Sequence, residues 1–180
     1  ITDEIRKSEL YAEVERFFAE IKRPWETPNR FRDWMKQAML SQAVIAASDA
    51  NIPLVIACDE KEDGAHGIRR FLIDTHGFSF DDILIVTSET KDSSDVHAFL
   101  SDPNKFIRSK QPRAIIHTAA METGFSIEEP CGVVVVADGR NHTLDACALL
   151  QMIGRCRKPA FIHCLLDERF RFENTDSLEL

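Results

Sequence analysis

Several familiar features are missing from this sequence. Its five cysteines form no C-x-x-C pair, it has no internal repeat, and no apolar run approaches the ~20 residues that a membrane-spanning helix needs. There is no G-x-x-x-x-G-K-[ST] loop to cradle phosphates and no D-E-x-[HD] run to hold Mg²⁺. These absences argue against a zinc site, a membrane partner and a nucleotide hydrolase that is complete within this chain.

The net charge and the cysteine content further limit the class of protein and the compartment that we expect. With 22 basic and 30 acidic residues, the chain has a formal net charge of −8, so it gains no long-range attraction to a phosphate backbone. That argues against a free-standing DNA-binding module. An odd number of cysteines, mostly within or beside apolar runs, is typical of free thiols in a reducing compartment. We therefore expect a cytoplasmic protein without a signal peptide and, because the chain begins at Ile1, a fragment of a longer polypeptide.

The amino-terminal part has a helical pattern. Apolar residues recur at helical spacing among charged ones in residues 2–21 and again in residues 29–48, and the segment R-P-W-E-T-P separates the two stretches. We expect residues 1–50 to form a helical extension or linker. Residues 51–170 are expected to form one α/β domain, and residues 171–180 a tail.

From Pro53 onward, short apolar runs alternate with helical patterns. The continuous runs suit strands that are buried on both faces of a parallel sheet. Strands are predicted within residues 53–60, 81–90, 114–117, 133–137 and 160–166. Helices are predicted at residues 64–76, 96–108 and 143–157, the second of them interrupted at Asp102-Pro103. The pattern predicts an open parallel α/β sheet of about five strands flanked by helices.

Polar side chains follow most of the predicted strands. In open parallel sheets, ligands bind beyond the carboxyl ends of the strands, so these positions are candidates for a site. The hydroxyls of Ser88, Thr90 and Thr118 could hold the phosphates of a nucleic-acid strand without a large basic patch. Solvated loops explain polar strand ends equally well. Of the six histidines, which show no metal-ligand spacing, His117 is the one expected near the site.

The end of the helix predicted at 143–157 carries the sharpest signal, Q-x-x-G-R-x-R. Its members are Gln151, Gly154, Arg155 and Arg157. Basic residues at a helix carboxyl end are often there only because the helix dipole favours them. Guanidinium groups in a fixed frame, however, also stabilise a γ-phosphoryl group during its transfer. Cys156 lies between the two arginines, whose charge could favour its thiolate.

These residues carry a resemblance to superfamily-2 helicases. The last segment resembles their motif VI, usually Q-x-x-G-R-x-x-R, although Lys158 stands where the second arginine is usual and Arg157 comes one residue early. The stretch H-T-A-A-M-E-T-G-F-S-I resembles motif V, with Thr118 and Gly124 at the usual spacing and Ser126 where many members have Asp. The stretch P-L-V-I-A-C-D-E resembles motif IV. The residues of these segments are most similar to those of origin-binding and plasmid replication helicases.

The resemblance implies the second RecA-like domain of an ATP-dependent DNA helicase or translocase, acting in DNA replication. Arg155 and Arg157 would be catalytic, acting on an ATP–Mg²⁺ site shared with a first RecA-like domain of the same polypeptide. The implied nucleotide contacts are Gln151, Gly154, Gly124 and Ser126. Ser88, Thr90 and Thr118 would contact single-stranded or duplex DNA. No metal ligand is expected in this chain, which alone should be inactive. Two alternatives stay open: a non-catalytic RecA-like interaction domain, and an unrelated α/β nucleotide-binding domain.

Overall fold

The computed structural model describes residues 28–59, 61–118, 125–137 and 146–166. The helix predicted at residues 2–21 and the predicted tail lie outside this part of the chain. The chain divides into two compact units, Ile1–Ala38 and Met39–Leu180. In the first unit, the described residues form the beginning of helix α2 (Pro28–Ala50), which continues into the second. The predicted division into residues 1–50, 51–170 and 171–180 stays a prediction.

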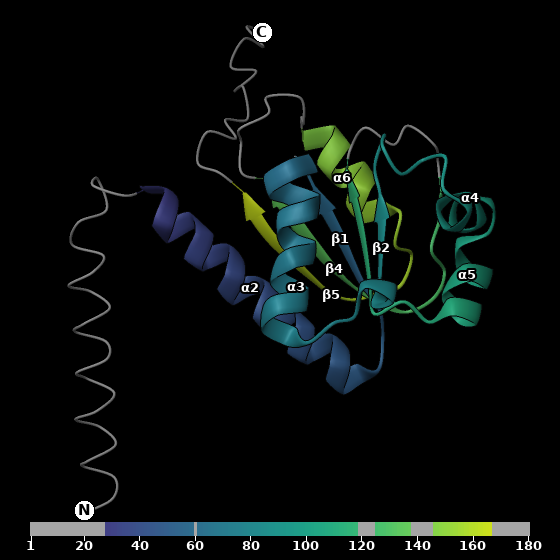
Figure 1. Ribbon diagram of the computed structural model, residues 1–180, viewed down its shortest axis with the longest axis horizontal. Helices are drawn as coiled ribbons and strands as arrows, with labels where there is room; N and C mark the ends of the chain where they lie inside the picture. Colours follow the sequence, from purple (N-terminus) through teal and green to yellow (C-terminus); the bar gives the residue numbers. More distant parts are fainter. Residues whose placement is uncertain (1–27, 60, 119–124, 138–145, 167–180) are drawn as a thin grey trace, which may run out of the picture. The chain divides into compact units, whose positions relative to one another are not determined.

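Five strands make one sheet, and every pairing in it is parallel (Figure 1). The strands are β1 (Leu54–Cys58), β2 (Ile83–Val86), β3 (Ala114–Thr118), β4 (Cys131–Ala137) and β5 (Pro159–Leu166), in the order β2-β3-β1-β4-β5. The predicted fold class, an open parallel α/β sheet of about five strands flanked by helices, is confirmed. This arrangement is consistent with the RecA-like domain that the motif resemblance implies.

The helices between the strands begin and end where local chemistry favours it. They are the π-helix η1 (Lys61–His66), α3 (Gly67–His76), the 3₁₀ turn η2 (Phe80–Asp82), α4 (Ser94–Ser101), α5 (Pro103–Lys110) and α6 (Ala146–Gly154). The predicted interruption at Asp102-Pro103 is confirmed as the boundary of α4 and α5. Asp102 accepts a hydrogen bond from the Lys105 N–H and Pro103 occupies the first turn, which is a favoured way to begin a helix. Gly77, at φ +64°, ends α3 in the left-handed conformation.

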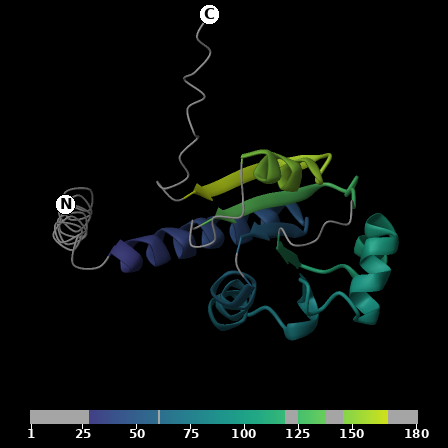
Figure 2. The same ribbon diagram turned by 90° about the horizontal axis from the view of Figure 1, so that it is seen from above.

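The sheet separates two apolar layers, and helices lie on both sides of it (Figure 2). Every residue of β1, β3 and β4 is buried, which explains why β1 and β4 are continuous apolar runs. One face of the sheet packs against α4, α5 and α6, through residues such as Phe99, Phe106 and Met152. The other packs against α3, through Ile68 and Leu72, and against the part of α2 from Met39 onward. In β5, a strand at the end of the sheet order, the residues are alternately exposed and partly buried.

The connections after β1 and β4 leave on opposite faces of the sheet, because α3 and α6 belong to different apolar layers. In open α/β sheets such a switch point is where ligands bind. The residues that follow β4, 138–145, lie outside the described part of the chain. None of the helices in the described ranges is long and apolar enough to cross a membrane.

Candidate functional site

The two arginines of the Q-x-x-G-R-x-R segment follow helix α6 and are not part of it. The helix ends at Gly154, and the chain then forms an isolated parallel bridge between Ile127 and Cys156. The Ile127 N–H donates to the Arg155 carbonyl and the Arg157 N–H donates to the Ile127 carbonyl, both at 2.8 Å. The prediction of a helix to Arg157 is therefore wrong, because the backbone beyond Gly154 bonds to Ile127 instead of continuing helically.

The bridge brings Ser126 and Arg157 together. The Arg157 Nε–H donates to the Ser126 hydroxyl at 3.0 Å, and that hydroxyl donates to the Glu128 carboxylate at 3.2 Å. A hydroxyl has one proton and two lone pairs, so it can make both bonds at once. Arg157 is exposed, and bonds this open to water contribute little free energy. Their consequence is geometric, since they give the Arg157 side chain a preferred direction.

Arg155 is held differently, against an aromatic ring. Its guanidinium carbon lies 4.6 Å from the centroid of the Phe125 ring, and burial lowers the pKa of Arg155. Phe125 in turn contacts His117 edge to face, with ring centroids 5.5 Å apart. Burial, and after it the positive charge of Arg155, lower the pKa of His117 to about 4, so this imidazole is neutral at pH 7. Within the described residues, no hydrogen-bond partner reaches its Nε2.

Helix α5 holds the segment that carries Ser126. Asn104 accepts hydrogen bonds from the Glu128 N–H at 2.7 Å and the Glu129 N–H at 3.3 Å, and its amide donates to the Ser126 carbonyl at 3.4 Å. Arg108 forms an ion pair with Glu129. Sequence patterns gave no signal for Asn104 or Phe125, since Asn104 is only a polar residue of a helix and Phe125 only an apolar one.

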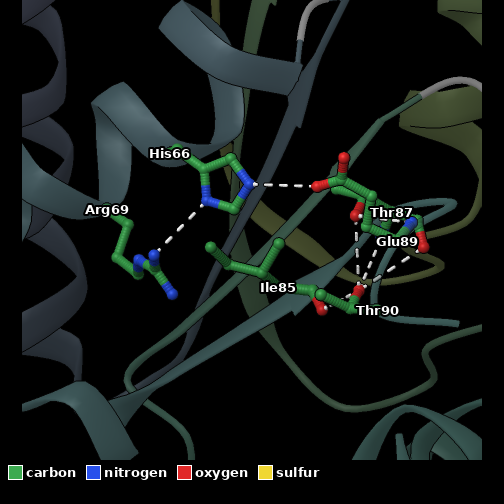
Figure 3. Close-up of polar contacts among 6 residues, drawn as sticks. All are labelled: His66, Arg69, Ile85, Thr87, Glu89 and Thr90. Carbon is green, nitrogen blue, oxygen red and sulfur yellow. Dashed lines mark hydrogen bonds and ion pairs between the residues drawn. The ribbon is translucent and has the colours of Figure 1, made fainter. Parts of the chain in front are cut away.

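The turn after β2 contains two of the predicted nucleic-acid contacts, Ser88 and Thr90, and Figure 3 shows the hydrogen bonds of Thr90. The Thr90 hydroxyl accepts from the Thr87 N–H at 2.9 Å and donates to the Ile85 carbonyl at 2.7 Å, so it already serves the turn. Ser88 is exposed. Val86, just before the turn, pairs with His117, so the turn starts beside the end of β3.

His66 contributes a further contact to this edge of the sheet (Figure 3). Its Nε2 lies 3.7 Å from a carboxylate oxygen of Glu89, and its Nδ1 lies 3.3 Å from an Arg69 guanidinium nitrogen. The sequence gave no reason to single out His66. The contact joins the end of η1 to the turn after β2, two segments that only the sheet brings together.

The remaining predicted site residues are spread over several elements. Thr118, the last residue of β3, is only 6% exposed, whereas Gln151 and Gly154 are exposed on the last turns of α6. Gly124 lies outside the described residues. The structure thus brings Ser126, Arg155 and Arg157 to one place, and it leaves Ser88 and Thr90 on the turn after β2.

The chemistry available at this place is cationic. Among the described residues, no three His, Cys, Asp or Glu side chains gather closely enough to hold a metal ion. A thiolate at Cys156 is not favoured, because a hydrogen bond with the Cys131 thiol and burial raise the Cys156 pKa, while the same hydrogen bond lowers that of Cys131. The groups that remain are the partly buried guanidinium of Arg155 and the exposed guanidinium of Arg157. Contacts with neighbouring side chains orient both, and oriented guanidinium groups suit an anionic ligand.

A cavity of about 440 Å³ lies at the amino-terminal edge of the sheet. Its lining includes Pro53, Pro112 and Pro130, which precede β1, β3 and β4, together with the ion pair of Arg108 and Glu129. Neither Arg155 nor Arg157 lines it. Through Glu129, the cavity therefore adjoins the segment that carries Ser126, but the two arginines do not line it.

Comparison with models of protein families found no match, and comparison with curated proteins found none either. Among solved structures, the chain is similar to the crystal structure of the Pyrococcus furiosus Hef helicase domain, with 16% identical residues and a TM-score of 0.48. The similarity covers 89% of this chain and 32% of the other, so this chain spans about a third of the length of that structure.

Proposed function

We propose that this chain is the second RecA-like domain of a superfamily-2 DNA helicase or translocase that acts in DNA replication in the cytoplasm. One observation carries the proposal: the bridge between Ile127 and Cys156 joins the segment resembling motif V to the segment resembling motif VI. Two segments that the motif resemblance had paired by function are hydrogen-bonded neighbours. Their fold, an open parallel sheet, is the one that the resemblance requires.

In the proposed mechanism, ATP and Mg²⁺ bind between this domain and a first RecA-like domain, which supplies the phosphate-binding loop and the metal ligands. Arg155 and Arg157 stabilise the charge of the γ-phosphoryl group as it is transferred. The residues proposed to contact the nucleotide are Gln151, Gly154, Gly124 and Ser126. Ser88, Thr90 and Thr118 contact the DNA backbone. Hydrolysis alternately closes and opens the cleft between the two domains, and this movement carries the protein along the DNA strand.

The test combines this chain with the domain that carries the phosphate-binding loop and measures DNA-stimulated ATPase activity. Arg155→Ala and Arg157→Ala are each expected to lower kcat by about 10³-fold, the lower end of the range for such arginines. Lys158→Ala is the matched control, since Lys158 is an exposed neighbouring cation in the usual position of the second arginine. Unchanged activity in both arginine variants would rule the proposal out, and a large effect of Lys158→Ala alone would reassign the second cation.

A non-catalytic interaction domain is the second candidate, favoured by the state of two predicted DNA contacts. The Thr90 hydroxyl is used within its own turn, and Thr118 is only 6% exposed. This candidate predicts that a single-stranded oligonucleotide binds no more weakly after Ser88→Ala. A clear loss of binding in that variant, measured by fluorescence anisotropy, supports the motor domain instead.

A further inference from the structure

We propose that Phe125 is a positioning residue for Arg155, whose guanidinium is held over the Phe125 ring so that it meets a phosphate in one orientation. This inference rests on the function proposed above, because it assumes that Arg155 acts on the γ-phosphoryl group. The role belongs to Phe125 itself, which the motif resemblance treats only as an apolar position between Gly124 and Ser126.

The contact has the geometry of a cation–π interaction. The Arg155 guanidinium carbon lies 4.6 Å from the ring centroid, within the ~6 Å over which the ring attracts a cation. A guanidinium is planar and can stack on the ring while its N–H groups point outward at the plane's edge. Such a contact restricts the side chain through the face of the guanidinium and not through its N–H groups.

The Phe125 ring is itself fixed. It is 6% exposed and meets two other rings edge to face, Phe99 at 5.2 Å and His117 at 5.5 Å between centroids. Turning the ring away would break both contacts and leave a gap in the packed layer. Because the ring is fixed, its contact with Arg155 restricts where the guanidinium can lie.

Arg155 is constrained both at its backbone and at its guanidinium group. At the backbone, the Arg155 carbonyl accepts from the Ile127 N–H at 2.8 Å. At the other end, the guanidinium rests on Phe125, two positions before Ile127, so the same segment holds both. Partial burial lowers the pKa of Arg155, yet an arginine stays charged at neutral pH. A poorly hydrated, oriented charge interacts more strongly with a phosphate than a free one.

The position of Arg155 can be measured in the full chain by NMR. Protons held over an aromatic ring are shifted upfield, so the Arg155 side-chain protons are expected upfield of those of Arg157. Phe125→Leu should abolish this shift. Phe106→Leu is the matched control, because Phe106 is also 6% exposed and lies in the same apolar layer, but its ring meets Phe99 edge to face. An unshifted Arg155 in the unsubstituted chain, or a shift that Phe125→Leu leaves intact, overturns the inference.

A second measurement separates this inference from the proposed function. In the ATPase assay with the first domain, Phe125→Leu should lower kcat by about 10- to 100-fold, with the KM for ATP little changed, while Phe106→Leu alters neither. If Arg155→Ala removes activity but Phe125→Leu behaves like Phe106→Leu, the positioning role is wrong and the proposed function stands. If Phe125→Leu abolishes the NMR shift but Arg155→Ala leaves activity unchanged, Phe125 positions Arg155 but the catalytic role of that arginine is wrong.

Discussion

The Nε–H of Arg157 donates to the Ser126 hydroxyl at 3.0 Å, across 31 positions of sequence. Both residues flank the short bridge between Ile127 and Cys156, so one backbone contact places two side chains. Ser126 stands where the resembling helicases usually have a carboxylate. Here the hydroxyl takes the Arg157 bond, and the carboxylate two residues later, Glu128, accepts from the hydroxyl.

Asn104 is expected to be the main anchor of this segment. Asn104→Ala removes its three hydrogen bonds to the backbone of residues 126–129, and we expect the free energy of unfolding to fall by about 1–2 kcal/mol. Amide hydrogen exchange at Glu128 should become faster. Ser101→Ala is the control, since that hydroxyl donates to the carbonyl of His97 one helical turn earlier. Equal effects of the two variants in urea denaturation would show that Asn104 has no special role.

The hydroxyl of Thr90 is expected to stabilise the turn after β2. Thr90→Val removes the acceptor of the Thr87 N–H and should lower the free energy of unfolding by about 1–2 kcal/mol, because that N–H loses its partner. Thr90→Ser keeps the hydroxyl and should lie close to the unsubstituted chain. Ser88→Ala, on the exposed side of the turn, should leave stability unchanged. The prediction is wrong if the valine and serine variants unfold at the same urea concentration.

Gly132 leaves room for an aromatic ring. A Cβ at this position would overlap the ring of Phe161, its partner on β5. Gly132→Ala is therefore expected to destabilise the chain by about 1–3 kcal/mol, the usual range for overpacking. In a Phe161→Ala background the same substitution should have little further effect, because the overlap is gone. A double-mutant cycle measures this, and purely additive effects would refute it.

His117 should make stability fall as the solution becomes acidic. Its pKa in the folded chain is about 4, mainly because of burial, whereas in the unfolded chain it returns to about 6.5. Below pH 6.5 the unfolded chain therefore binds a proton that the folded chain does not, which favours unfolding until the pH reaches about 4.

Between pH 7 and pH 5 this difference should remove about 2 kcal/mol of the free energy of unfolding. His117→Phe keeps a ring against Phe125 but cannot titrate, so its stability should depend less on pH over this interval. Urea denaturation at the two pH values checks the prediction. The same loss in both chains would show that other groups account for it.

The fold was largely predictable from local patterns. The runs L-V-I-A-C and C-G-V-V-V-V-A are buried along their whole length, and such short continuous apolar runs are typical of strands covered on both faces. The break at Asp102-Pro103 was equally readable, since Pro103 removes an N–H and fixes its own backbone. Such signals are local, so they can be recognised in the sequence without knowledge of the tertiary contacts.

The site was predictable only in its residue types. The pattern of Gln151, Gly154 and the arginines singled out the right segment, but it predicted a helix where the chain leaves α6 to bridge Ile127. Hydrogen bonds over 31 and 24 positions, from Arg157 to Ser126 and from Glu128 to Asn104, have no sequence periodicity. The cation–π contact of Arg155 with Phe125 has none either. These contacts follow from strand order and sheet packing, which place segments side by side that no local pattern connects.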